Sequence, residues 1–340
     1  MKSTMKSAKK SMQALSSLKL SFAAMVALLS AILFSYFEQS QSVLWLAIPL
    51  LVLAVNLLFA MTYNPRIRQN SGLLMFHICL LAMVLLAALG QLTSMKGRVE
   101  IMQGQVFDSK QATVVQQGPW HSLRALNKVD FEQRHFQVNY SQGLRRGATH
   151  SQLLVNGESF VVGDNLPFNH QGYRFYTTSN KGYAVILNWY GKDGKTSQGA
   201  IHFPSYPLYD WKQDNQWFTP AGQLLKMSFV SAIQPQTDTS WQLESSQAAG
   251  SLQIEAATGK QQVLKVGQRI RLQAGELEFV EVRMWMGYSI FYNPWLIWFF
   301  AVSLVGVFGL AWHYYLKLGP RKLPAREISS VRGKRAVHPV

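Results

Sequence analysis

The feature that most constrains this chain is an almost unbroken apolar run at residues 72–92. About 20 apolar residues in a row are enough for one helix to cross the hydrocarbon core of a bilayer. The imidazole of His77 lies inside this run, roughly 7 Å from its beginning at a rise of 1.5 Å per residue. An unpaired polar group in hydrocarbon costs several kcal/mol, so His77 must have a partner.

Three further apolar runs, at residues 18–37, 43–63 and 294–316, have a similar length. The first exceeds the apolar part of a usual signal peptide and has no small-x-small site before Glu38, so we expect it to stay as a helix. The short link at 38–42 predicts an antiparallel hairpin of the first two spans. Within the second, we expect Asn56 to form an interhelical hydrogen bond. The sequence therefore predicts four transmembrane helices.

The formal charge of +16 is placed at the ends of these spans. Lysines crowd residues 1–17, Arg66 and Arg68 precede the third span, and residues 317–340 are strongly basic. A nucleic-acid-binding protein would instead carry a basic face on a folded domain, so we expect a lipid bilayer and no nucleic acid as partner. The positive-inside rule predicts both termini in the cytoplasm of a bacterium and residues 93–293 in the periplasm. Lys96 and Arg98 weakly favour the opposite, but a long domain crosses regardless of its charge.

Residues 93–293 alternate between apolar and polar side chains, with glycine and Asn/Asp turns between the alternating segments. This pattern is typical of β-strands. We expect an all-β sandwich or open barrel, with strands at 136–140, 152–155, 159–162, 183–189, 252–254, 263–266, 268–272 and 277–282. The fold class is thus an integral membrane helical segment plus a large all-β domain outside the membrane.

Aromatic residues gather at both ends of the last span. Such groups, about one membrane thickness apart, are typical of interfacial belts, and we favour this interpretation over a stacking platform for a flat ligand. The group at its beginning comprises Trp285, Tyr288, Phe291, Tyr292, Trp295 and Trp298, and the group at its end Trp312, Tyr314 and Tyr315.

Motifs for catalysis are absent from the sequence, which has no P-loop, no dinucleotide fingerprint and no nucleophile elbow. The single cysteine, Cys79, excludes an internal disulfide, and the missing Cys-x-x-Cys-His excludes covalently attached haem. We expect surface or loop roles for five histidines of the β region, which have no second ligand at metal spacing, and so interpret it as a binding or scaffolding module. These are His121, His135, His150, His170 and His202.

His77 has two interpretations that its chemistry alone leaves open. It is structural if it hydrogen-bonds Asn56, Ser30 or Ser35, or keeps one backbone contact. It is functional if its imidazole is the axial ligand of a planar apolar cofactor, for which haem b, bound non-covalently, is the natural candidate. His313, near the end of the last span, is expected to be an interfacial residue, with a second haem ligand as the alternative.

Several short segments, in this order and topology, resemble the ResB (CcsB) family of System II cytochrome c biogenesis. They are SSLKL at 16–20, NLL at 56–58, GLLMFH at 72–77, GQVF at 104–107, FQVNYSQG at 136–143 and GYRFY at 172–176.

The resemblance implies that the chain pairs with a CcsA-type membrane protein as a haem exporter and cytochrome c synthase. Haem would be held between a histidine of each partner and attached outside to the Cys-x-x-Cys-His of apocytochrome c. His77 matches the family's transmembrane histidine. Because the chain lacks a tryptophan-rich haem motif, we expect a subunit that is not active alone and assign it no catalytic residue. The alternative is a membrane-anchored sensor or assembly scaffold that binds no haem.

Overall fold

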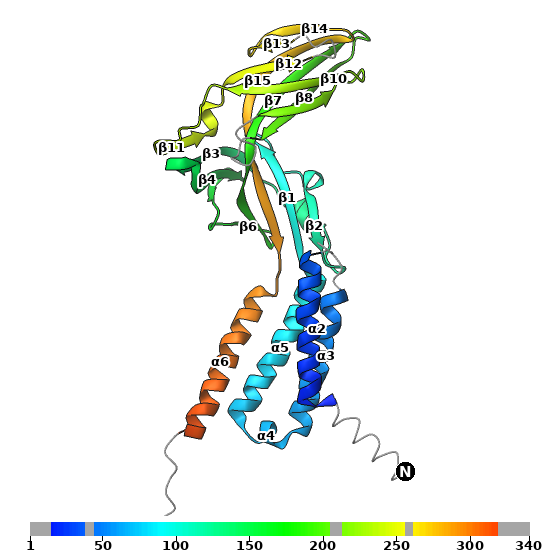
Figure 1. The fold of residues 1–340 in the computed structure, drawn as a ribbon, viewed down its shortest axis with the longest axis vertical. Coiled ribbons are helices and arrows are strands. Elements are labelled where there is room, and N and C mark those ends of the chain that lie inside the picture. Colours follow the sequence, from blue (N-terminus) through cyan, green and yellow to red (C-terminus); the bar gives the residue numbers. More distant parts are fainter. Residues whose placement is uncertain (1–14, 38–43, 205–212, 256–260, 319–340) are drawn as a thin grey trace, which may run out of the picture. The chain divides into compact units, whose positions relative to one another are not determined.

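The computed structural model describes residues 15–37, 44–204, 213–255 and 261–318 (Figure 1). The chain divides into two compact units. One is helical and contains the residues up to Leu89 and from Trp295 onward, and the other is a β unit, Gly90–Pro294. Most of the basic N-terminus and tail expected from the sequence, and the link at 38–42, lie outside the described residues.

Four helices are long and apolar enough to cross a membrane, which confirms this part of the predicted fold. They are apolar around their whole circumference and bury few of their side chains, as helices surrounded by lipid do. In hydrocarbon a helix is favoured because it satisfies its backbone hydrogen bonds internally. The four helices are α2 (Leu18–Phe37), α3 (Leu44–Tyr63), α5 (Ser71–Thr93) and α6 (Leu296–Leu318).

A short helix, α4 (Pro65–Arg68), connects α3 to α5. The side chain of Asn64 caps it by accepting a hydrogen bond from the backbone N–H of Arg66 at 3.1 Å. Pro65 occupies the first helical turn, where its missing N–H costs nothing. The Asn-Pro pair thus ends one span and sets up the next.

Asn56 joins α2 to α3, as the sequence predicts. Its Oδ1 accepts a hydrogen bond from the Ser21 hydroxyl at 2.5 Å, and its Nδ2 donates to the carbonyl oxygens of Leu15 and Ser17 at 2.7 and 3.1 Å. All polar atoms of this buried side chain are therefore satisfied within the hairpin, and the predicted interhelical hydrogen bond is confirmed.

The β unit consists of antiparallel sheets, and none of the described sheets closes into a barrel. The largest has the path β2-β1-β15-β7-β6, with β14 added to β15 and β8 to β7. A second has the order β11-β3-β4-β5 and a third the order β13-β12-β10-β9. The strands are β1 (Met95–Met102), β2 (Thr113–Gln117), β3 (Glu132–Ser141), β4 (Arg145–Val155), β5 (Glu158–Val162), β6 (Phe168–His170), β7 (Tyr173–Gly191), β8 (Thr196–Pro204), β9 (Asp214–Phe218), β10 (Leu224–Ser231), β11 (Trp241–Glu244), β12 (Gly250–Glu255), β13 (Gln261–Leu264), β14 (Arg269–Leu272) and β15 (Gly275–Tyr292).

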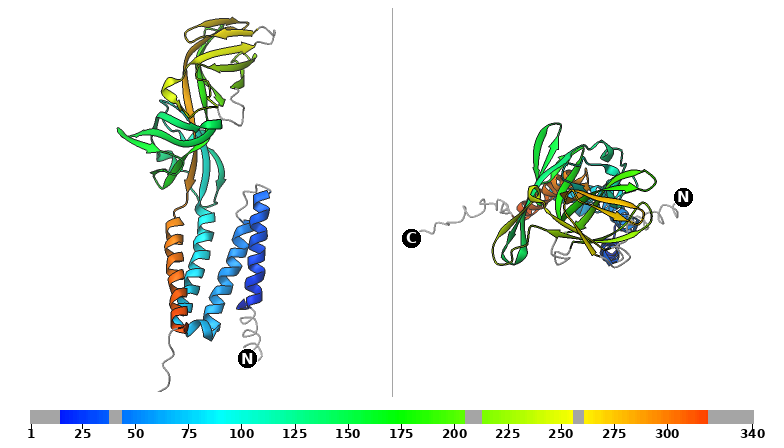
Figure 2. Two further views of the ribbon diagram at one scale, coloured as in Figure 1. Left: turned by 60° about the vertical axis from the view of Figure 1, so that its left-hand side comes forward. Right: turned by 90° about the horizontal axis from the view of Figure 1, so that it is seen from above.

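Two long strands, β7 and β15, run through the whole β unit and are shared by its two lobes (Figure 2). One lobe contains the sheet β11-β3-β4-β5, and the other contains the sheet β13-β12-β10-β9. Their pairing shifts in the middle, where Thr177 lies opposite Tyr288 and Lys181 opposite Met286. Residues 178–180 therefore bulge out of β7. A Cβ on the facing Gly287 would lie 2.7 Å from the Thr178 hydroxyl, so this position requires glycine.

Aromatic side chains connect the sheets within each lobe. Tyr183 of β7 packs on Phe229 of β10, with ring centroids 4.8 Å apart. In the other lobe the hydroxyl of Tyr288 is hydrogen-bonded to Ser151 of β4 and Gln133 of β3. The sheets thus face each other across one core, as in a sandwich.

Two residues of the predicted aromatic belt are buried within the β unit instead. Trp285 and Tyr288 are 1% and 0% exposed, and the indole of Trp285 donates a hydrogen bond to the carbonyl oxygen of Tyr183 at 3.0 Å. The belt interpretation is wrong for these two. Both lie on the strand β15, before the chain reaches α6. Tyr288 is part of the hydrophobic core, and Trp285, on the other face of the strand, is covered by the stacked ring of His202.

Candidate functional site

His77 lies in the second turn of α5 and is partly buried. Its Nδ1 lies 2.7 Å from the carbonyl oxygen of Leu73, one turn earlier. Because a carbonyl oxygen only accepts, Nδ1 carries the proton and Nε2 carries the lone pair. Nε2 makes no hydrogen bond to any residue that the structure describes. This is the single backbone contact that the sequence left open as one possibility, and it also leaves Nε2 ready to bind a metal centre.

The surroundings of His77 on the helix are apolar. Leu74 and Leu81 lie at the i−3 and i+4 positions, on the same face. The ring of Phe76 stands edge-on to the imidazole, with centroids 5.6 Å apart. Such a face can shelter a flat apolar ligand beside the imidazole.

A different face of α5 packs against α6 through glycines. A Cβ on Gly72 would lie 2.7 Å from the backbone nitrogen of His313, and one on Gly306 would lie 3.0 Å from Cβ of Cys79. At about 100° per residue, His77 lies roughly 140° around the helix from Gly72. The imidazole of His77 therefore does not point into the α5–α6 contact.

His313 has a partner of its own. Its Nδ1 lies 3.0 Å from the side-chain oxygen of Asn70, whose backbone carbonyl accepts the N–H of Leu74 at 2.8 Å in the first turn of α5. His313 lies level with Gly72, which is about 7 Å along the helix axis from His77. The structure does not bring the two histidines together within this chain.

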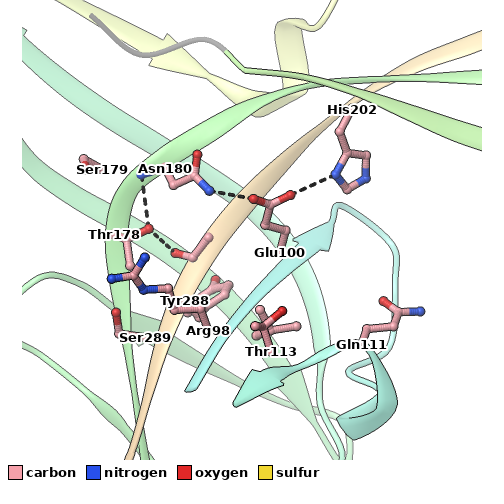
Figure 3. Close-up of a pocket in the computed structure, with 12 residues that line it drawn as sticks. Arg98, Glu100, Gln111, Thr113, Thr178, Ser179, Asn180, His202, Tyr288 and Ser289 are labelled. Atoms are coloured by element: carbon pink, nitrogen blue, oxygen red, sulfur yellow. Dashed lines mark hydrogen bonds and ion pairs between the residues drawn. The ribbon is translucent and has the colours of Figure 1, made fainter. Parts of the chain in front are cut away.

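A polar cleft of about 880 Å³ opens in the β unit beside the bulge of β7 (Figure 3). At one end, Glu100 of β1 accepts hydrogen bonds from Asn180 at 2.6 Å and from Nδ1 of His202 at 3.2 Å. These bonds, that from His202 first, hold the pKa of Glu100 below its ordinary value. The His202 ring stacks on Trp285 with centroids 5.3 Å apart. The guanidinium of Arg98 also lines the cleft and forms no ion pair with a described residue.

The other histidines of the β unit have local roles where the structure gives them contacts. His121 donates to the backbone, His135 accepts from Gln103 at 2.8 Å, and His170 stacks on Phe168. Among the described parts of the chain, no three His, Cys, Asp or Glu side chains are grouped to hold a metal ion.

A charged cluster around a buried lysine is a feature that sequence reasoning missed. Lys181 is fully buried, 5.3 Å from the centroid of the Tyr140 ring, and its Nζ donates to the carbonyl oxygen of Ser179 at 3.3 Å. Nearby, Arg146 forms an ion pair with Asp164 at 2.6 Å. The alternating pattern of β7 places Lys181 at an inward position, but a lysine in a strand is usually read as exposed.

The fold and the site together define a class: a membrane protein with four apolar helices, a histidine inside one of them, and one large antiparallel β unit. A sequence model of the ResB-like family matches residues 68–318, which is more than half of the chain. The chain therefore belongs to the ResB-like family, which is associated with cytochrome c biogenesis. No curated protein matches it at a significant level. The matched segment contains α5 with His77, the β unit and α6.

Proposed function

We propose that this protein holds haem b in the membrane on His77 and, together with a CcsA-type partner, passes it to apocytochrome c for covalent attachment. The observation that carries the proposal is the fixed tautomer of His77. Its Nδ1–H donates to the carbonyl of Leu73, so the lone pair of Nε2 is directed away from the backbone and can coordinate an iron.

Haem would supply an iron that needs only one or two axial ligands from protein, because the porphyrin provides the other four. A single histidine in an apolar helix therefore suits haem, whereas a bare metal ion would need several protein ligands. His77 would bind the iron, and Leu74, Phe76 and Leu81 would exclude water from that side. The partner would supply a second histidine, since His313 lies level with Gly72, about 7 Å along the helix axis from His77.

We further propose that the protein lies in the bacterial cytoplasmic membrane with both termini inside and residues 93–293 in the periplasm. The placement of lysine and arginine at the two termini and beside α4 supports this orientation. The β unit then faces the compartment in which apocytochrome c receives its haem.

The test is the visible spectrum of the full chain, co-expressed with its CcsA-type partner and purified in detergent. We expect a Soret band in the wild type that is lost or shifted in His77→Ala, at equal yield. His313→Ala is the matched control, because it also removes an imidazole from a span, and it should keep the band. Added imidazole should restore a low-spin spectrum to His77→Gly. An unchanged spectrum in His77→Ala would refute haem ligation by this residue.

The alternative, a membrane-anchored sensor or scaffold without haem, has one observation in its favour. The cleft at Glu100, Asn180 and His202 is a polar surface that requires no cofactor. It also contains Arg98, a cation that forms no ion pair within the described part of the chain. If the wild type binds no haem, and if Arg98→Ala abolishes cytochrome c maturation in cells, this alternative would replace the haem proposal.

A further inference from the structure

The loop at residues 118–121 completes the C-terminal end of the membrane helix α5. The last four carbonyl groups of a helix have no partner within it. Here the backbone N–H of Trp120 donates to the carbonyl of Leu92 at 2.9 Å, and Nδ1 of His121 donates to that of Thr93 at 3.0 Å. The N–H of Gly118 donates to Ser94 at 2.8 Å. The loop is therefore bonded directly to the last residues of α5.

Close packing holds the loop in this place. A Cβ on Gly118 would lie 2.3 Å from the carbonyl oxygen of Leu92, so only glycine allows the approach. His121 is held from its other side by the Tyr173 hydroxyl, which donates to Nε2 at 2.9 Å, and by the ring of Tyr292, whose centroid is 4.8 Å away. Burial lowers the pKa of His121, which favours the neutral ring that these two hydrogen bonds need. These contacts thus fix the position of Trp120 along the axis of α5, next to the end of the helix.

The length of α5 places this end at the membrane surface. Its 23 residues span about 35 Å, slightly more than the roughly 30 Å of a hydrocarbon core. Leu92 therefore lies close to the boundary between hydrocarbon and headgroups. Trp120, hydrogen-bonded to it, is 65% exposed. An exposed indole is costly in water and favoured at the headgroup level.

Two cations lie near the loop of this tryptophan, one along the chain and one through strand pairing. Arg124 follows it in the same loop, and Lys96 lies on β1 next to Met95, which pairs with Gln117 where the loop begins. Both side chains are exposed, and neither forms an ion pair with any residue in the described ranges. Basic residues near a membrane surface attract anionic headgroups, by about 1 kcal/mol each.

We propose that Trp120, Arg124 and Lys96 form a binding site for an anionic phospholipid headgroup at the end of α5. The indole lies among the headgroups, and the two cations pair with the phosphate. The proposal does not depend on haem binding at His77. It also gives Lys96, which opposes the positive-inside pattern, a lipid partner outside the membrane.

The first experiment measures the depth of position 120. The full chain carries Cys79→Ala and Trp120→Cys with a nitroxide label, in vesicles of phosphatidylcholine with added phosphatidylglycerol. We expect the ratio of collisions with oxygen to collisions with a water-soluble nickel chelate to exceed, by about twofold or more, that of a label at Phe218→Cys. Phe218 is the matched control because it is similarly exposed, at 66%, and lies on β9. Equal ratios at the two positions would overturn the proposal. So would protection from both reagents, which would show that protein covers the loop.

The second experiment measures bound lipid directly, by native mass spectrometry of the wild-type chain released from the same vesicles. We expect retained phosphatidylglycerol to fall several-fold in Arg124→Gln and in Trp120→Ala, and in the wild type at high salt, because salt screens exposed charges. Lys226→Gln, which removes an exposed cation of β10, is the control and should change nothing. Equal retention in all variants would refute the site, whatever the haem spectrum shows.

Discussion

At the scale of single residues, the least expected feature is the lysine sealed between two sheets of the β unit. Burial, together with the nearby guanidinium of Arg146, lowers the pKa of Lys181 to about 7, while Asp164 opposes the shift. A fully buried ammonium group is destabilising unless it is well paired. Its one hydrogen bond to Ser179 and the face of Tyr140 only partly offset this cost.

Lys181→Met should therefore stabilise the protein. The pKa of the lysine is near 7 in the folded chain and 10.5 when unfolded, so between these values the unfolded state binds more protons. The free energy of unfolding of the wild type should rise with pH across this window, and the full cost of the buried charge is present below pH 7. The variant should lose this slope and gain up to several kcal/mol at neutral or lower pH, at about 1.4 kcal/mol per pKa unit.

Denaturant unfolding of the full chain, followed by tryptophan fluorescence at several pH values, measures both effects. Lys226→Met removes an exposed lysine from the same unit and serves as the control. If the free energy of unfolding changed with pH in the same way in the wild type and in Lys181→Met, the pKa of Lys181 would not be perturbed by folding.

At the scale of elements, the contact of α5 with α6 depends on small residues. Lipid supplies no hydrophobic force between helices, so they associate through close packing, for which glycine is suited. On α6, a Cβ on Gly309 would lie 2.9 Å from Cε of Met75 and 3.2 Å from the carbonyl oxygen of Gly72. The apolar runs predicted both helices, but their composition does not show which faces meet.

Gly72→Ala should loosen this pair. The new Cβ would meet the backbone of His313 at 2.7 Å and the carbonyl of Gly309 at 2.8 Å, and backbone atoms cannot move aside cheaply. We expect a loss of about 1–3 kcal/mol, typical of overpacking, seen as a lower thermal unfolding midpoint in detergent. Gly199→Ala is the control, since a Cβ at that position meets nothing within 4 Å. An unchanged midpoint in Gly72→Ala would contradict the close contact.

Among the strands, the alternating pattern identified most elements but not their partners. The turn at Asn156 and Gly157 was predicted, and both residues have positive φ, of 49° and 86°, as a tight hairpin requires. The pairing of β1 with β15 joins residues almost 200 positions apart, and no local pattern encodes it. The bulge of β7, which helps to form the cleft, depends on another distant pairing, that of β7 with β15.

At the scale of the whole molecule, the orientation in the membrane is the most direct test of the chain's organisation. The proposed topology places Phe218 of β9 outside the cell membrane and Lys334 of the tail inside. In a Cys79→Ala background, a membrane-impermeant maleimide should label Phe218→Cys in intact spheroplasts and label Lys334→Cys only after lysis. Labelling in the reverse order would contradict the positive-inside assignment.

The sequence by itself determined the four spans and the presence of an all-β unit. These depend on local chemistry: a helix in lipid needs about 20 consecutive apolar residues, and a half-buried strand needs alternation. It also singled out His77, because an imidazole in hydrocarbon is costly wherever the chain leads.

Only the tertiary structure decided the contacts that turn these elements into sites. Asn70 is hydrogen-bonded to His313 across 243 residues, Trp285 stacks on His202, and Lys181 is buried between sheets. The tautomer of His77 was also decided here, by its hydrogen bond to Leu73. Burial and pairing are properties of residues brought together from distant parts of the chain. The periodicity of apolar residues along the chain does not predict which distant parts will meet.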